Sequence, residues 1–167
     1  MSQSIRECQQ CQGTTRAGRR CSRSTCMYYK FCFQHAQNRT GLAVKNSLIP
    51  RAGKGLFAVR NFPRGTTFKY KGEILTARER DARYPGDMLG EYVLCYGRGR
   101  GRRCVDARST QSCLARYAND ARGTRFRHNA EFVDPARGER WPLLRLTRDV
   151  QAGEEILVFY SDEYWER

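Results

Sequence analysis

The residues best suited to chemistry are cysteines and a histidine gathered near the N-terminus. Five of the eight cysteines lie there, followed by one histidine: Cys8, Cys11, Cys21, Cys26, Cys32 and His35. The spacing Cys11-x9-Cys21-x10-Cys32-x2-His35 supplies four ligands of the kind that zinc prefers. Because residues 1–40 contain few other apolar side chains, metal binding would replace the missing hydrophobic core. We therefore predict a zinc-binding module over residues 1–40, with these four residues as ligands.

Two cysteines of this segment, Cys8 and Cys26, are left over. Cys8 could replace Cys11 as a ligand, the two could be free thiols, or they could pair on oxidation. The alternative to a zinc module is an unliganded or disulfide-paired tail, which a reducing compartment disfavours. The other cysteines are scattered and are predicted to be small buried hydrophobic side chains: Cys95, Cys104 and Cys113.

The chain is strongly basic, with 31 Lys and Arg against 17 Asp and Glu and a formal net charge of +14. Such an excess indicates attraction to a polyanion, and nucleic acid is the first candidate. Residues 1–40 carry seven basic residues and one acidic residue, so this module is the more strongly polarised part. The run "GRGRGRRC" at 97–104 could contact nucleic acid, although a mobile, solvated connection between two strands explains it equally well.

The N-terminus is polar and shows no secretory signal pattern. No apolar run approaches the roughly 20 residues that a membrane-spanning helix needs. We therefore expect a soluble, intracellular protein with no membrane partner.

The elements that must position chemical groups begin after residue 41, where short runs of Val, Ile, Leu, Phe and Tyr are broken by Gly and Pro. This pattern is typical of β structure. The candidate strands are 42–49, 55–59, 67–70, 91–96, 103–106, 130–133, 143–147 and 155–159. One helix is predicted to follow Thr76, which would cap it together with Glu79 in a capping box. The stretch "CLARYAND" at 113–120 could form a single helical turn.

Four stretches follow one another along the chain: "AGKGLFA", "GEYVLCY" with "CVDARS", "LARYAND" with "RHNAEF", and "GEEILVFYSDEYW". Each is weak alone, because glycine pairs and Asn-Asp steps are ordinary turn chemistry. Together they resemble the SET-domain protein lysine methyltransferases over roughly residues 42–165. The resemblance implies a mostly β, β-clip SET fold with small helices and a C-terminal pseudoknot. The predicted domains are thus the zinc module at 1–40 and a SET domain at 41–167.

The resemblance implies S-adenosylmethionine as the methyl donor, and it assigns the residues that bind it. The family signature Arg-Phe-x-Asn-His begins here as Arg116, Tyr117 and Asn119. Asp120 replaces the histidine, and seven extra residues, "ARGTRFR", precede His128-Asn129. The implied cofactor-binding residues are Lys54, Gly55, Leu56, Tyr92, Arg116, Tyr117, Asn119, Asp120, Tyr164 and Trp165. His128 itself is interpreted as a loop or packing residue.

Catalysis is assigned, by the same resemblance, to Tyr160 and Tyr92. Tyr160 would orient the lysine amine or the methyl donor, and Tyr92 would contact the cofactor. The lysine channel would be lined by Tyr92, Val158 and Tyr160. Because Val158 carries no hydroxyl at the position that limits methyl number, we expect di- or trimethylation. Glu154 and Glu155 are interpreted as a turn and a solvated strand start.

The implied activity is in-line methyl transfer to a deprotonated lysine on histone tails or another basic protein, with nuclear localisation. Surplus positive charge could bind nucleosomal DNA, and a second chain in a homodimer could complete the cover over the cofactor. The alternative is a nucleic-acid-binding zinc-module protein with a catalytically inactive SET scaffold. The enzymatic interpretation requires Asn119 and Tyr160, some forty positions apart, to meet at one cleft.

Overall fold

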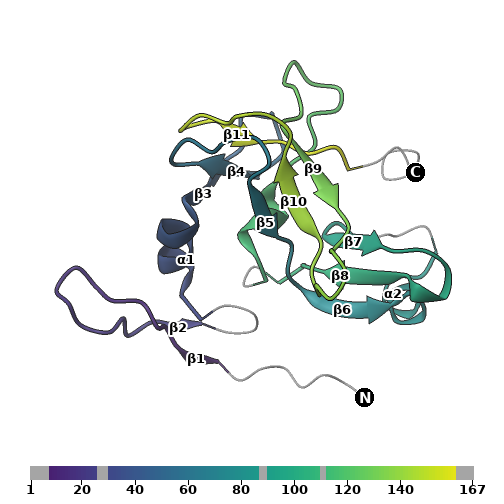
Figure 1. Cartoon of the computed structure of the whole chain (residues 1–167), viewed down its shortest axis with the longest axis horizontal. Coiled ribbons are helices and arrows are strands. Elements are labelled where there is room, and N and C mark those ends of the chain that lie inside the picture. The colour runs from purple at the N-terminus through teal and green to yellow at the C-terminus, as the bar shows by residue number, and fades with distance from the viewer. Residues whose placement is uncertain (1–7, 26–29, 87–89, 110–111, 161–167) are drawn as a thin grey trace.

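The computed structural model of the protein describes residues 8–25, 30–86, 90–109 and 112–160. In chain order its elements are β1 (Gln9–Gln10), β2 (Ser24–Thr25), α1 (Phe33–Thr40), β3 (Leu42–Asn46), β4 (Lys54–Ala58), β5 (Thr67–Lys69), β6 (Glu73–Thr76), α2 (Ala77–Arg83), β7 (Val93–Tyr96), the 3-10 turn η1 (Gly99–Gly101), β8 (Arg103–Asp106), the 3-10 turn η2 (Leu114–Tyr117), β9 (Ala130–Val133), β10 (Leu143–Leu146) and β11 (Glu155–Ile156). Figure 1 shows β1, β2 and α1 forming an arm beside the body that holds the later strands. The described part is mostly β, as predicted.

Three antiparallel sheets of three strands each make up the body of the molecule. Their strand orders are β11–β4–β3, β5–β10–β9 and β6–β8–β7. Several neighbours are distant in the chain: Glu155 of β11 lies opposite Phe57 of β4, and Leu144 of β10 lies opposite Phe68 of β5. This long-range pairing brings the C-terminal segment back onto the glycine-rich turn that precedes β4.

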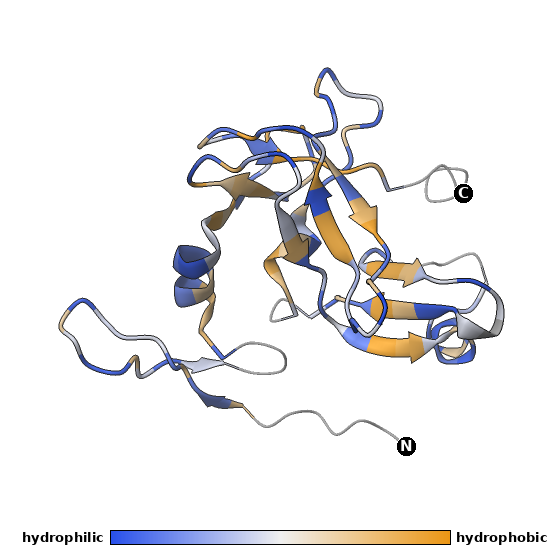
Figure 2. Cartoon of the chain, viewed as in Figure 1, coloured by the Kyte–Doolittle hydropathy of each residue, from blue (hydrophilic) through white to orange (hydrophobic). Residues whose placement is uncertain are grey.

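The apolar faces of the three sheets share one core. Leu56 of β4, Val105 of β8 and Leu144 of β10 are fully buried and belong to one contiguous cluster. Burying each such side chain contributes about 1.5–3 kcal/mol relative to leaving it in water. Figure 2 shows the same division, with hydrophobic colour along the strands of the body and hydrophilic colour over much of α1. Among the residues that the structure describes, no helix has the length and apolar character needed to cross a membrane.

The predicted strands each overlap a strand of the structure, and the predicted helix is present as α2. Its capping box is complete: the Glu79 amide donates to Thr76 Oγ1 at 3.2 Å, and the Thr76 amide donates to Glu79 Oε2 at 2.8 Å. The elements not predicted from the sequence include β1, β2, β6 and α1. The helix α1 is polar on most of its surface and buries Ala36 alone, so no apolar periodicity marks it. Its end is set by Gly41, whose φ of 73° favours glycine.

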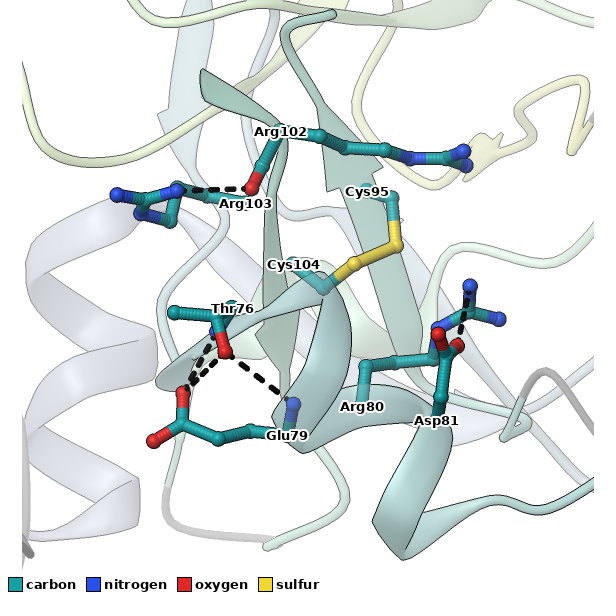
Figure 3. The surroundings of a disulfide bond; sticks show 8 residues. All are labelled: Thr76, Glu79, Arg80, Asp81, Cys95, Arg102, Arg103 and Cys104. Carbon is teal, nitrogen blue, oxygen red and sulfur yellow. Dashed lines mark hydrogen bonds and ion pairs between the residues drawn. A yellow bond between two sulfur atoms is a disulfide. The ribbon is translucent and has the colours of Figure 1, made fainter. Parts of the chain in front are cut away.

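The cysteines of the β7–β8 hairpin are not the isolated hydrophobic side chains that were predicted. Cys95 and Cys104 lie directly opposite each other in the hairpin register and form a disulfide bond (Figure 3). The arginine-glycine run connects the two strands, as expected, and includes η1. Only the strand register reveals the pairing, because nine positions separate the two cysteines. Cys113 matches its prediction: it is buried, and burial raises the pKa of its thiol.

The C-terminal segment crosses between two earlier segments. The Val158 amide donates to the Asn119 carbonyl at 2.9 Å, and the Asn129 amide donates to the Leu157 carbonyl at 2.9 Å. The buried Asn129 side chain also donates to the Glu155 carbonyl and accepts from the Leu157 amide, both at 2.8 Å. These bonds explain why asparagine occupies position 129, and they carry the chain to Tyr160.

Candidate active site and metal centre

A cleft of about 550 Å³ lies where the C-terminal segment meets the turn before β4. Its lining residues are Ile49, Pro50, Arg51, Ala52, Gly53, Lys54, Glu91, Tyr92, Arg116, Tyr117, Asn119, Asp120, Arg122, Thr124 and Tyr160. Asn119 and Tyr160 therefore lie at the same cleft, which the enzymatic interpretation requires. The volume is within the range of about 300–1,000 Å³ that small-molecule sites occupy.

A buried glutamate fixes one wall of this cleft. Glu155 accepts hydrogen bonds from Ser47 Oγ at 2.7 Å and from the Leu48 amide at 2.8 Å, and Asn119 Nδ2 lies 3.3 Å from Glu155 Oε1. Asn119 Nδ2 also donates to the Lys54 carbonyl at 2.9 Å. The interpretation of Glu155 as a solvated strand start is therefore wrong, because its carboxylate ties the turn to the asparagine motif.

The close approach of this carboxylate explains the glycine at position 55. A Cβ atom on Gly55 would collide with the Glu155 carboxylate, so only glycine fits without movement. Gly53 has a φ of 71°, which also favours glycine. The glycine pair that looked ordinary in the sequence is thus required for two separate reasons: the close approach of Glu155 at position 55 and the backbone conformation at position 53.

We predict that Glu155→Gln lowers the free energy of unfolding by about 1–3 kcal/mol, the cost of leaving buried partners of a charged group imperfectly paired. Affinity for the S-adenosylmethionine that the resemblance implies should fall with it, because the turn and Asn119 lose their shared anchor. Denaturant unfolding and calorimetric titration measure the two effects. The matched control is Glu154→Gln, since Glu154 pairs with Arg148 at 2.7 Å on the surface and such pairs contribute about 0–1 kcal/mol. Equal losses in both variants would contradict the assignment.

Arg116 holds the opposite wall. It is buried, and its Nε donates to the Ala107 carbonyl at 2.7 Å while its Nη2 donates to the Arg108 carbonyl at 3.1 Å. Its guanidinium also lies 3.7 Å from the centre of the Tyr92 ring. A cation at this distance attracts the face of an aromatic ring, so Arg116 fixes the orientation of Tyr92 in the cleft.

A second, narrower cavity of about 50 Å³ adjoins the cleft. It is lined by Tyr70, Glu91, Val93, Leu94, Ala115, Arg116, Ala118, Phe132 and Tyr160. Glu91, Arg116 and Tyr160 line both spaces, so the two meet at these residues. The Tyr160 hydroxyl donates to the Ala118 carbonyl at 2.7 Å, which holds the phenol at the junction.

The sequence analysis missed Tyr70 as a residue of this cavity. Tyr70 is buried, and its hydroxyl donates to the Tyr92 carbonyl at 3.0 Å. Burial raises the pKa of the Tyr70 phenol well above its ordinary value, so the hydroxyl stays protonated and remains a donor. In the sequence Tyr70 stands between two lysines in "FKYKG", and nothing local marks it as a site residue.

The predicted cofactor residues fall into three groups. Those that line the cleft are Lys54, Tyr92, Arg116, Tyr117, Asn119 and Asp120. Gly55 and Leu56 are buried in β4 and are not among its lining residues. Tyr164 and Trp165 lie outside the described residues. The cofactor-binding roles of all these residues stay predictions.

Val158 is not where its predicted role would place it. The side chain is fully buried in the core and lines neither the cleft nor the narrow cavity. The reason is its pairing: residue 158 bridges to Ala130 while its amide bonds to Asn119, and this turns the side chain toward the core. The walls of the narrow cavity come instead from Tyr70 and Phe132, among others.

The four predicted metal ligands lie together in the N-terminal module. One ligand atom from each of Cys11, Cys21, Cys32 and His35 lies within 4.8 Å of every other. The Cys21 and Cys32 sulfur atoms are 4.0 Å apart, and His35 Nδ1 lies 3.3 Å from Cys32 Sγ. Tetrahedral zinc with ordinary bond lengths needs sulfur–sulfur separations of about 3.8 Å and sulfur–nitrogen separations of about 3.5 Å. The donor set therefore fits zinc.

The surroundings of this group support the same assignment. His35 Nε2 lies 3.0 Å from the Thr14 carbonyl, which requires the ring proton on Nε2 and leaves Nδ1 free to face a metal. The Cys32 and Gly13 amides point to Cys11 Sγ at 3.1 and 3.3 Å, as expected for a thiolate. Cys8 is disulfide-bonded and does not belong to the group, and Cys26 lies outside the described residues.

Comparisons with known proteins agree with this architecture. The SET domain family model matches residues 53–161. N-lysine methyltransferase KMT5A-A of Danio rerio is 27% identical over 138 residues, which cover 77% of this chain and 39% of the relative. The Xenopus laevis protein of the same name is 30% identical over 127 residues, covering 71% of this chain and 36% of the relative. This chain thus spans less than half the length of these curated relatives.

A solved structure shares the fold at low sequence identity. The methyltransferase domain of human PR domain-containing protein 2 superposes with a TM-score of 0.56 and 18% identity. The match covers 77% of this chain and 83% of that domain. It therefore extends over most of the described body.

Proposed function

We propose that this chain, which belongs to the SET-domain family, is an S-adenosylmethionine-dependent protein-lysine N-methyltransferase. The observation that carries the proposal is the position of Tyr160, which lies at the junction of a wide cleft and a narrow cavity. A methyltransferase that acts on lysine needs this arrangement, with one space for the donor and another for a single extended side chain. Relatives named as lysine methyltransferases support the reaction class.

The wide cleft is the proposed site for S-adenosylmethionine, which when bound supplies a methyl group already activated on a sulfonium. Asn119 presents its side-chain amide there, and Lys54, Arg51 and Arg122 supply positive charge for a carboxylate. Tyr92 offers an aromatic face held in place by Arg116. The predicted contacts of Tyr164 and Trp165 with the cofactor are part of the proposal.

The narrow cavity is the proposed lysine channel. A lysine amine has an unperturbed pKa of about 10.4 and must lose a proton before it can accept a methyl group. The apolar walls from Phe132 and Leu94 disfavour the charged form, and the buried guanidinium of Arg116 adds repulsion. Tyr160 then orients the neutral amine toward the cleft, because its hydroxyl is fixed on the Ala118 carbonyl.

The proposed substrate is a basic protein segment such as a histone tail. Glu91 is exposed, lines both spaces and shows no hydrogen-bond or ion-pair partner within the described residues. An unpaired carboxylate at the channel entrance attracts a positively charged substrate even though the chain as a whole is basic.

We predict that Glu91→Gln raises KM for a lysine-containing histone-tail peptide about two- to fivefold, with kcat nearly unchanged, the range expected for an exposed charge pair. The difference should shrink at high salt. Steady-state kinetics at two ionic strengths measure both effects. Glu131→Gln is the matched control, because Glu131 pairs with Arg145 away from both spaces. A variant that loses S-adenosylmethionine affinity instead would place Glu91 against the donor.

The number of methyl groups transferred is a further part of the proposal. Val158 does not line the narrow cavity, so its missing hydroxyl no longer supports the expected di- or trimethylation, and mass spectrometry of the product would distinguish mono- from di- or trimethyl-lysine. Exposed arginines of the zinc module and of the β7–β8 connection, including Arg16, Arg19, Arg98 and Arg102, suit nucleosomal DNA in the nucleus. A homodimer could add cover to the cleft.

The deciding experiment is mass spectrometry of recombinant histones after incubation with the protein and labelled S-adenosylmethionine. Methylated lysine in the presence of the wild type, absent without it, is the expected result. No transfer to histones or to total cell protein, together with tight salt-sensitive DNA binding, would favour the nucleic-acid-binding alternative. Transfer to cell proteins alone would move the substrate away from histones while keeping the enzyme class.

A further inference from the structure

The two departures from the family signature meet in the folded chain. Asp120 stands where the signature has histidine, and the seven inserted residues 121–127 end at His128. His128 Nε2 lies 2.6 Å from Asp120 Oδ1. Building on the proposed function, we infer that Asp120 and His128 form one positioning unit that holds Tyr160 at the junction of cleft and channel.

Asp120 is the centre of this unit. Its side chain is 1% exposed, and a carboxylate in such a place needs hydrogen-bond donors to offset the loss of water. It accepts from the Tyr160 amide at 2.9 Å, from the Arg122 amide at 2.8 Å and from His128 Nε2. At 2.6 Å the two atoms share a proton, and the Ala121 amide also approaches His128 Nε2, at 3.1 Å.

The contacts of Asp120 bear directly on Tyr160. The backbone of Tyr160 is held by Asp120, and its hydroxyl is held by the Ala118 carbonyl at 2.7 Å. His128 also packs edge-on against Phe159, with ring centres 5.7 Å apart. The histidine therefore touches both the carboxylate and the residue that precedes Tyr160. A shift of any of these groups moves the phenol relative to the channel.

The insertion is folded so that it returns to its starting point. The Thr124 amide and hydroxyl both donate to the Ala121 carbonyl, at 3.1 and 2.7 Å, and the Phe126 amide donates to Thr124 Oγ1 at 3.1 Å. Figure 1 shows the segment between η2 and β9 as a loop that projects from the body. Its two ends meet at the Asp120–His128 contact, so the insertion supplies a histidine close to the position from which the substitution removed one.

His128 is a positioning residue rather than a proton acceptor for the substrate. It lines neither the cleft nor the narrow cavity, and its Nε2 is engaged by Asp120. Its effect on the reaction must therefore pass through Asp120 and Tyr160.

The test compares His128→Ala with His128→Gln, whose side-chain amide can place a donor near the position of Nε2. Amide hydrogen exchange of Tyr160, followed by NMR, should accelerate about tenfold in the alanine variant, the change expected when a hydrogen bond to a charged group is weakened. With histones as substrate, kcat should fall about tenfold and KM should stay within about twofold, since positioning acts on the reacting geometry. The glutamine variant should recover most of both losses. Arg127→Ala is the control within the same loop.

Unchanged Tyr160 exchange and unchanged kcat in His128→Ala would overturn the inference. So would equal losses in the alanine and glutamine variants, because the ring would then act by packing alone. If the alanine variant fails to fold, the glutamine variant decides through the same two measurements. Failure of the proposed function is separable: the wild type would transfer no methyl group, yet exchange of the Tyr160 amide would still depend on position 128.

Discussion

Replacing Tyr160 with phenylalanine will reduce methyl transfer by about two to three orders of magnitude, the loss typical of removing one preorganised polar group at a reacting centre. The Tyr160 hydroxyl donates to the Ala118 carbonyl at 2.7 Å, and this bond fixes the ring at the junction of the two spaces. Single-turnover assays with saturating S-adenosylmethionine measure the chemical step directly.

The fold should survive this change, because the Tyr160 amide keeps its bond to Asp120. The matched control is Tyr96→Phe. This change removes a hydroxyl that donates to the Arg140 carbonyl at 3.2 Å, and Tyr96 lines neither space. Activity of Tyr160→Phe within a few-fold of the wild type would remove Tyr160 from the mechanism. Equal losses in both tyrosine variants would point to a general effect on stability.

Loss of zinc will unfold the N-terminal module while the body stays folded. Three of the four ligands are buried cysteines, and few other apolar side chains in this segment could hold it together. Zinc binding by comparable small sites contributes about 10–16 kcal/mol near pH 7. We expect one zinc ion per chain by metal analysis. Limited proteolysis after chelation should cut within residues 8–40 and spare the sheets.

Cys32→Ala should give the same proteolysis pattern without chelation. The control is Cys113→Ala, since Cys113 is buried in the main core away from the four ligands. Full zinc content in Cys32→Ala would show that another ligand completes the site. Unfolding of the sheets on chelation would mean that the module also supports the body, with which Ala36 of α1 shares a core.

Features that depend on neighbours in the chain were predictable from the sequence. The capping box of α2 joins residues three positions apart, and hydrophobic runs bounded by Gly and Pro marked most of the strands. The cluster of Cys11, Cys21, Cys32 and His35 was also predictable, because cysteine and histidine spacing carries the chemistry of a metal site almost independently of the fold.

Features that depend on strand register or on crossing segments were not predictable. From the order of side chains along the C-terminal segment we could not predict that Val158 faces the core while Tyr160 reaches the cleft. Glu155 looked like a surface residue until the turn before β4 folded over it. Cys95 and Cys104 looked isolated until the hairpin placed them opposite each other.

The sequence alone determined the composition of this protein's two parts: a cysteine and histidine set suited to zinc, and an ordered series of motifs typical of a SET domain. Only the tertiary structure decided which side chains share a space, because pairing of β11 with β4 and of Tyr160 with Asp120 joins residues far apart in the chain. Local propensity is insensitive to such contacts, since their free energy appears only when distant segments pack together. The partnership of Asp120 with His128 belongs to this second kind.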